Sequence, residues 1–119
     1  MVSEPRIVTK GWGYETIWTD NENYCSKFLT FRQGKKSSLH YHRVKNESFF
    51  VLKGKFELTI VDQRFGEDKK ILMTPGCNIY IPAMTIHQLH CHECDIEGEI
   101  LEVSTEDRYD DNYRIKKGD

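Results

Sequence analysis

The sequence has little that would build a helical or membrane-spanning protein. Its 119 residues include only three prolines, and no apolar run approaches the roughly 18 residues that a membrane-spanning helix needs. No apolar stripe at helical spacing continues over several turns, and the polar N-terminus has no apolar segment typical of a secretion signal. We therefore expect a cytoplasmic protein with little helix, whose length suits a single domain over residues 1–119.

The chain also lacks a large charge of either sign. Its net charge of −2 argues against the basic surface of nucleic-acid-binding proteins and against attraction to an anionic membrane. The four cysteines, Cys25, Cys77, Cys91 and Cys94, would permit two disulfides in a secreted chain. Because no export signal precedes them, we expect reduced thiols that pack like small apolar side chains.

What the sequence does contain is a series of short runs rich in Ile, Val, Phe, Tyr and Thr, separated by Gly, Asn, Asp and Pro. These runs predict β-strands at 13–18, 24–31, 37–42, 47–53, 55–62, 69–72, 78–81, 86–91 and 98–104. Pro75 and Gly76 form the centre of a predicted type II turn, in which glycine takes positive φ easily. Strands this short and numerous, with no long helix to cover a sheet, indicate an all-β sandwich or small closed barrel.

Side chains with metal-binding chemistry interrupt this pattern near the middle of the chain. His40 and His42 are one residue apart on a predicted strand, so their side chains point to the same face. Glu47 begins the next strand after a short connection, and a hairpin would bring it opposite the two histidines. His87 lies near the start of a later strand. Imidazoles and a carboxylate that converge inside a barrel are a typical first-row transition-metal site.

The spacing of these residues resembles the two sequence motifs of the cupin superfamily. The first motif is matched, at every position and spacing, by Gly34, His40, His42, Glu47 and Gly54. The second is matched by Gly76, Pro82 and His87. Within it, Met84 stands where a glycine is common and Cys91 where an asparagine is common.

The resemblance to cupins implies a fold and a ligand set. The implied fold is all-β, a cupin jelly-roll barrel or double-stranded β-helix. The implied cofactor is one divalent transition metal ion, Zn, Mn, Fe or Ni. By the same resemblance, its ligands are His40, His42, Glu47 and His87.

Three further segments narrow the resemblance within the superfamily. KGWGYETIW at 10–18, SSLHYH at 37–42 and LEVST…DDNYRI at 101–115 resemble, in the same order, stretches of type II mannose-6-phosphate isomerase. The chain resembles a small stand-alone relative of that cupin. This implies a small-molecule substrate, a sugar or sugar phosphate, and isomerase or epimerase activity. Aldose–ketose isomerisation needs a Lewis acid and a base that moves a proton between C1 and C2.

The catalytic and substrate-binding residues follow from strand phase and charge. Glu102 alternates with Leu101 and Val103 on a strand that borders the pocket in the family it resembles, and we expect it to be the catalytic base. Tyr80, Tyr41 and His90 are the other candidates for the base, and His90 is the weaker one because it is expected on the opposite face of its strand from His87. Substrate binding is expected from aromatic or cationic residues near the pocket mouth: Tyr41, Arg43, Lys45, Tyr80 and Arg114.

Several alternatives remain open from the sequence. The chain could be another metallo-cupin enzyme, such as an iron dioxygenase, or a non-catalytic cupin that binds a sugar or another ligand. The Cys91-x-x-Cys94 pair with its adjacent histidines could indicate a second zinc or redox site, but it lacks a second ligand pair and a thioredoxin-like context. We also expect a homodimer formed by an N-terminal strand around 6–18, with apolar residues Ile7, Trp12, Ile17 and Trp18.

Overall fold

The computed structural model describes residues 1–119 and contains strands, turns and irregular segments but no helical segment. No helix long and apolar enough to cross a membrane is therefore present. The predicted all-β fold is confirmed. The strands are β1 (Arg6–Lys10), β2 (Gly13–Asp20), β3 (Cys25–Arg32), β4 (Leu39–Tyr41), β5 (Glu47–Lys53), β6 (Lys55–Asp62), β7 (Glu67–Met73), β8 (Asn78–Ile81), β9 (His87–Glu93), β10 (Glu97–Ser104) and β11 (Tyr113–Lys116).

Most strands agree with the sequence prediction, and three coincide with it: β5, β6 and β8. The differences lie near the ends of the chain and around the first histidines. The N-terminal strand around 6–18 is in fact a hairpin of β1 and β2, and β11 was not predicted. The predicted strand 37–42 is ladder-paired only over Leu39–Tyr41. Gly76 has φ +91°, as the predicted turn requires.

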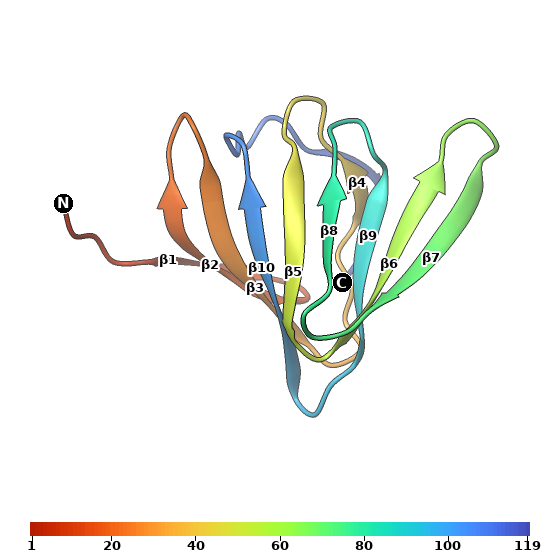
Figure 1. The fold of residues 1–119 in the computed structure, drawn as a ribbon, viewed down its shortest axis with the longest axis horizontal. Helices are drawn as coiled ribbons and strands as arrows, with labels where there is room; N and C mark the ends of the chain where they lie inside the picture. Colours follow the sequence, from red (N-terminus) through yellow and green to blue (C-terminus); the bar gives the residue numbers. More distant parts are fainter.

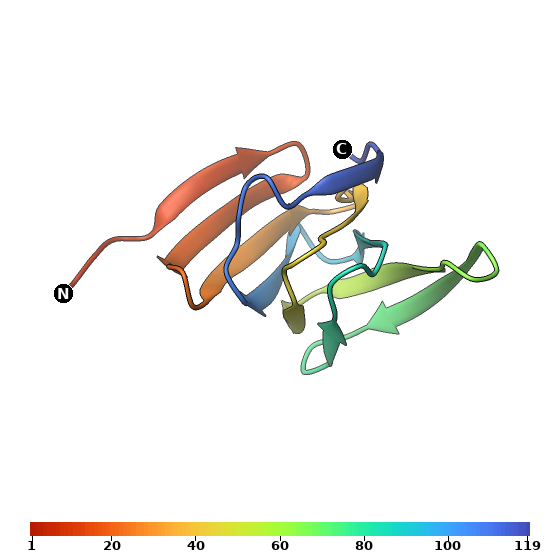
Figure 2. The same ribbon diagram turned by 90° about the horizontal axis from the view of Figure 1, so that it is seen from above.

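Two antiparallel sheets face each other, as Figures 1 and 2 show. One sheet has the strand order β1-β2-β3-β10-β5-β8 and the other β11-β4-β9-β6-β7. Strands distant in sequence lie side by side, since β10 pairs with β3 along its whole length and β4 pairs with β9. This order brings strands from early, middle and late parts of the chain around one interior.

The core lies between the sheets and is built from alternating side chains of each strand. Phe31 on β3 meets Phe56 on β6 edge to face at 5.3 Å between ring centroids. Trp12 stacks on Phe31 at 4.0 Å. The Phe31–Phe56 contact joins the two sheets at one end of the interior.

Toward the other end, the inward side chains change from apolar to polar on several neighbouring strands. On β5 the inward series runs from Val51 through Phe49 to Glu47, all buried. On β9 it runs from Cys91 to His87. β10 pairs with both β3 and β5, and its inward side chains run from Ile100 to Glu102. The change occurs at the same height on each strand, so the buried side chains Glu47, His87 and Glu102 gather at one end of the barrel.

The N-terminal hairpin differs from the expected interface strand. Trp12 and Ile17 are each only 9% exposed and belong to the interior, so the prediction that they are available for an interface is wrong. Ile17 lies on β2 and pairs with the buried Lys27 of β3, whereas Trp12 precedes β2 and stacks on the core residue Phe31. Ile7 and Trp18 are exposed, at 59% and 51%. β1 has only one neighbour and forms the edge of its sheet.

Candidate metal centre

Three histidines from two neighbouring strands converge inside the barrel. His40 lies on β4 and His42 directly follows it, whereas His87 begins β9. His40 and His87 are paired across the β4–β9 ladder. One nitrogen from each imidazole lies within 4.8 Å of the other two, an arrangement that could hold one metal ion.

Each of the three imidazoles has its Nδ1 next to a backbone carbonyl oxygen. The Nδ1–O distances are 2.9 Å from His40 to Ser38, 2.6 Å from His42 to Asp111 and 2.8 Å from His87 to Thr85. A carbonyl can only accept, so each Nδ1 carries the hydrogen and donates it. In the neutral form of each ring the lone pair therefore lies on Nε2, the nitrogen available to a metal.

Glu47 lies beside this cluster at the start of β5 and is 2% exposed. Its Oε2 is 3.1 Å from His42 Nε2 and its Oε1 is 3.6 Å from His87 Nε2. Glu47 Oε2 and His87 Nε2 are both buried and have no hydrogen-bond partner. Each such buried polar atom costs about 1–3 kcal/mol. A divalent cation between these acceptors would remove that cost, so the donor set fits a transition metal.

The ionisation of His40 and of Glu47 agrees with a cation site. Burial and the neighbouring His87 lower the pKa of His40 to about 3, so this imidazole is neutral and free to coordinate. Burial alone would raise the pKa of Glu47, but the adjacent His42, His87 and Lys45 together hold it well below its usual range. The carboxylate is therefore charged at neutral pH.

The loop before β9 is held against the histidines by its backbone. Met84 has φ +71°, a left-handed conformation that glycine adopts most easily, and it occupies the position where the cupin motif commonly has glycine. Its backbone N–H donates to the carbonyl of His42 at 2.6 Å. The side chain of Asn46 accepts a bond from the N–H of Ala83 at 2.9 Å. The loop thus keeps its conformation with methionine in place of glycine.

Asp111, in the segment before β11, fixes the turn between β4 and β5. Its carboxylate accepts the backbone N–H groups of Arg43 at 2.7 Å and Lys45 at 2.9 Å, as well as that of Val44. This turn separates His42 from Glu47. Sequence reasoning placed the DDNYRI segment in the family pattern but assigned Asp111 no role, because a carboxylate that binds backbone amides distant in sequence has no local signal.

A cavity of about 820 Å³ adjoins the histidine cluster. His40, His42, Glu47 and His87 form part of its wall, together with Lys45 and Glu102. Lys45 is 4% exposed, and its Nζ lies 3.7 Å from Glu47 Oε2 and 3.3 Å from Glu102 Oε2. The ammonium group of Lys45 thus lies between Glu102, the predicted base, and Glu47, a candidate metal ligand.

Two residues that sequence reasoning missed complete this charged wall. Asp107 contacts Lys45 Nζ at 3.1 Å and Lys27 Nζ at 3.0 Å. Lys27 is 5% exposed, and a lysine inside the apolar run YCSKFLTF was the one available sequence signal for it. Burial raises the pKa of Glu102, against the opposing effect of the two lysines. The lysines outweigh burial at Asp107 and lower its pKa to about 2.

The other predicted site residues are divided between the cavity and the outer surface. Arg114 on β11 lines the cavity and is paired with His40 across the ladder. Tyr41, Arg43 and Tyr80 do not line it. Tyr41 stacks on Tyr113 at 5.1 Å, and Arg43 lies 5.8 Å from the centre of the same ring.

Tyr80, on β8, is 60% exposed on the outer face of the six-stranded sheet. Strand alternation turns Tyr41 away from its neighbours His40 and His42. His90 is likewise separated from the buried face of β9 that carries His87, in agreement with the strand-phase prediction.

The facing sheets define a jelly-roll barrel, and the histidine cluster at one end of its interior could hold a metal ion. A family model described as cupin domain matches residues 27–104, and the chain belongs to the cupin family.

One curated relative and several solved structures place the chain among known proteins. The mannose-1-phosphate guanylyltransferase of Sinorhizobium fredii (strain NBRC 101917 / NGR234) is 32% identical over 94 residues, which cover 79% of this chain and 17% of that protein. The chain therefore spans about a sixth of that relative's length. The capsular polysaccharide assembling protein CapF of Staphylococcus aureus is 16% identical with a TM-score of 0.84, over 97% of this chain and 35% of CapF.

Oxalate decarboxylase from Bacillus subtilis is 20% identical with a TM-score of 0.81, over 93% of this chain and 30% of that one. Another structure of oxalate decarboxylase, with a TM-score of 0.79 and 20% identity, is described through its Mn(II) centres. At these identities the solved structures show a shared fold.

Proposed function

We propose that this protein is a metal-dependent cupin enzyme that isomerises or epimerises a sugar or sugar phosphate, in the manner of mannose-6-phosphate isomerase. The observation that supports this most strongly is the shared cavity wall, in which the histidine cluster and the buried Lys45–Glu102 pair lie next to each other. The name of the curated relative, a mannose-1-phosphate guanylyltransferase, favours a sugar phosphate as the small-molecule substrate.

The proposed ligands of the metal ion are the Nε2 atoms of His40, His42 and His87 and the carboxylate of Glu47. When bound, a divalent ion of Zn, Mn, Fe or Ni would polarise the carbonyl and hydroxyl oxygens of the substrate. The protein's own contribution is to hold the imidazoles in one tautomer through three backbone carbonyls. In this proposal the ligand side chains keep the positions that they have in the structure.

Glu102 is the proposed base. Its side chain is buried, which raises its pKa and makes the carboxylate a better proton acceptor than one in water. Lys45 holds the Glu102 carboxylate at 3.3 Å and also touches Asp107, so the base has a fixed orientation. In this proposal Glu102 takes the proton from one carbon of the substrate and returns it to the neighbouring carbon.

The cavity volume and its charges support a phosphorylated sugar. About 820 Å³ lies within the range of cavities that hold small organic ligands. Lys45 is already surrounded by carboxylates, so it is a positioning cation in this proposal. Arg114 is exposed and lines the cavity, and it is the proposed phosphate contact.

The test begins with identification of the metal on the purified protein. The metal-loaded protein is then incubated anaerobically with mannose 6-phosphate and, separately, fructose 6-phosphate. We expect interconversion, its loss in Glu102→Gln with full retention of metal, and no loss in Glu99→Gln, a partly exposed residue on the opposite face of β10.

Oxygen consumption by the loaded protein would instead indicate a dioxygenase. Sugar-phosphate binding without turnover would indicate a binding protein. Either result contradicts the proposal.

A further inference from the structure

Cys91 and Cys94 lie close together because of an irregularity in β9. In a regular strand, residues three apart point to opposite faces. Here Phe56 of β6 pairs with Cys91 while the adjacent Lys55 pairs with Glu93, so His92 is an extra, bulged residue. The bulge changes the phase of the strand and returns Cys94 to the side of Cys91. The two Sγ atoms lie 3.3 Å apart.

The turn that carries Cys94 is held in place by Gln33, which follows β3. The side-chain oxygen of Gln33 accepts the backbone N–H of Cys94 at 2.7 Å and its thiol at 3.1 Å. The backbone N–H of Gln33 donates to the carbonyl of Ile96 at 3.0 Å. Cys91 is held from the same segment, since its N–H donates to Lys35 and its carbonyl accepts from Gly34. Hydrogen bonds from the segment 33–35 therefore hold both cysteines in place and keep their sulfur atoms close together.

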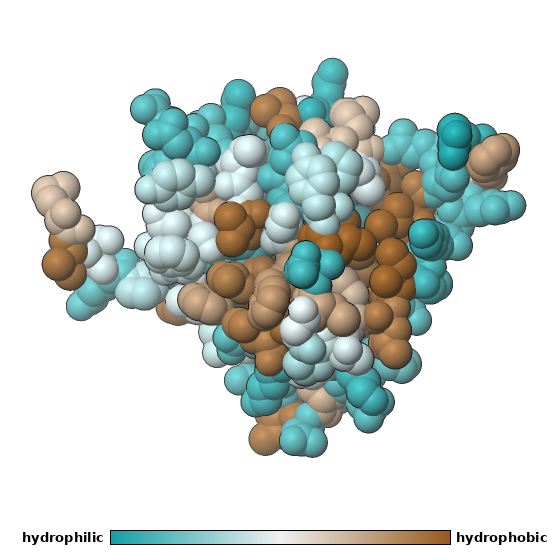
Figure 3. Space-filling view, viewed as in Figure 1, coloured by the Kyte–Doolittle hydropathy of each residue, from teal (hydrophilic) through white to brown (hydrophobic).

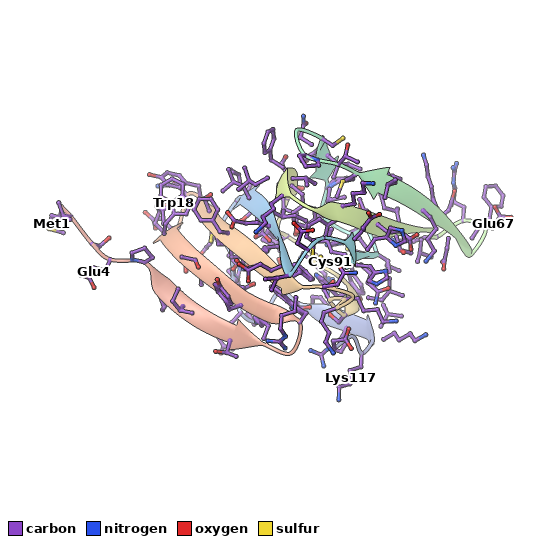
Figure 4. The ribbon with its side chains drawn as sticks, turned by 90° about the horizontal axis from the view of Figure 1, so that it is seen from below. Met1, Glu4, Trp18, Glu67, Cys91 and Lys117 are labelled. Carbon is purple, nitrogen blue, oxygen red and sulfur yellow. The ribbon has the colours of Figure 1, made fainter.

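The two thiols differ in accessibility. Cys91 is 0% exposed and belongs to the core, and Figure 4 shows it in the middle of the molecule. Cys94 is partly exposed. Burial and the neighbouring Cys94 raise the pKa of Cys91 to about 12, so Cys91 is a poor first nucleophile. An external reagent meets Cys94 first.

We propose that Cys91 and Cys94 form a modification site that reacts with low-molecular-weight disulfides such as glutathione disulfide and closes to an intramolecular disulfide. The site is separate from the candidate metal centre and stands whether or not the proposed isomerase activity is correct. It uses no ligand of that centre. The other two cysteines do not enter it.

The reaction balances with glutathione disulfide as the oxidant. The Cys94 thiolate attacks one sulfur of glutathione disulfide, forms a mixed disulfide and releases one glutathione thiolate. The sulfur of Cys91 then attacks the sulfur of Cys94, loses its proton and releases the second glutathione. In total, two protein thiols lose two electrons and two protons, and one glutathione disulfide becomes two glutathione thiols. The sulfurs need to approach from 3.3 Å to a bond length of about 2 Å.

The test uses the full chain with Cys77→Ser, because Cys77 is exposed and would react by itself. This variant is treated with glutathione disulfide, and the remaining thiols are alkylated and counted by mass spectrometry. We expect two thiols to be lost without any retained glutathione, and a Cys91–Cys94 link in the digested peptides. Cys25, which is buried, serves as the internal control and should remain alkylatable after unfolding.

Two additional variants separate the steps. Cys77→Ser with Cys91→Ala, which keeps the buried position apolar, should retain one glutathione on Cys94. Cys77→Ser with Cys94→Ser should retain none. If Cys77→Ser keeps all three thiols, or ends with glutathione on Cys94 and no internal link, the proposal is overturned.

Discussion

The backbone carbonyl of Asp111 accepts a 2.6 Å hydrogen bond from Nδ1 of His42. The carboxylate of the same residue binds the backbone of the turn that leads from His42 to Glu47. One residue near the end of the chain thus fixes the tautomer of one proposed ligand and the path to another. The cupin barrel of this protein is therefore closed at the site by a segment from outside its strands.

Replacement of Asp111 by alanine should weaken metal binding. The variant removes the acceptor of the N–H groups in the 43–45 turn, of which that of Lys45 is buried, at a cost of about 1–3 kcal/mol in the free energy of unfolding. Because the turn also orients His42 and Glu47, we expect metal affinity to fall about 10- to 100-fold. Competition titration with a chromogenic chelator measures the affinity. Asp110→Ala, at the exposed neighbour, is the control, and an equal effect in both variants would argue against this role.

Loss of one imidazole should distinguish the cluster from the other histidines of β9. His87→Ala should remove bound metal and the stabilisation that metal gives, which is about 2.7 kcal/mol when free metal is 100 times the dissociation constant. His90→Ala, on the same strand but off its buried face, should keep both. Metal content and thermal melting with and without added metal provide the measurements. Retention of metal by His87→Ala would show that the ligand set is wrong.

The buried charge cluster predicts a specific acid dependence of stability. The folded pKa of Asp107 is about 2 and its ordinary value is 3.8, so its ionisation stabilises the fold above pH 4 and this contribution is lost as pH falls toward 2. Asp107→Asn should therefore be less stable than the unmodified protein by roughly 2 kcal/mol at pH 7. The difference should shrink between pH 4 and pH 2.

Urea unfolding at a series of pH values measures this difference. Asp95→Asn, in the exposed β9–β10 turn, should show no comparable pH-dependent difference. A constant difference for Asp107→Asn across that range would mean that its carboxylate contributes through packing and not through charge.

The proposed homodimer makes a prediction for the N-terminal hairpin. β1 is an edge strand and Ile7 is 59% exposed beside it, so a second copy could extend the sheet there. Light scattering should give twice the chain mass of 14.1 kDa, and Ile7→Lys should shift it to the monomer mass. A monomer at all concentrations would contradict the proposal. A dimer unaffected by Ile7→Lys would point instead to the outer sheet face, where Figure 3 shows apolar side chains gathered over the middle strands. Phe50 and Leu52 on β5 and Val103 on β10 are exposed.

The parts of the fold that depend on local pattern were predictable from the sequence. Strand β5 begins at Glu47 and alternates inward through Phe49, so both its bounds and its buried face follow from period-two alternation. His40, His42 and His87 were found by the same alternation together with the family spacing. Each of these residues carries its signal within a few positions of itself.

The parts that were missed or misplaced depend on contacts between distant segments. Lys27 and Asp107 are 80 residues apart, and only the pairing of β3 with β10 brings their regions together. Tyr41 and Arg43 were expected at the cavity, but they lie outside it against the ring of Tyr113 on β11, a strand that was not predicted. The contact between Cys91 and Cys94 depends on a bulge that breaks the alternation from which the strand was predicted.

The three carbonyls that receive the imidazole Nδ1 hydrogens all belong to the main chain, at Ser38, Thr85 and Asp111. Main-chain acceptors persist when a side chain is exchanged, provided that the chain keeps its path. Natural variation around the centre can therefore alter the size, charge and specificity of the cavity while the same nitrogen of each ring stays available. A barrel built in this way can be adapted to new substrates by changes in its lining without rebuilding its donor set.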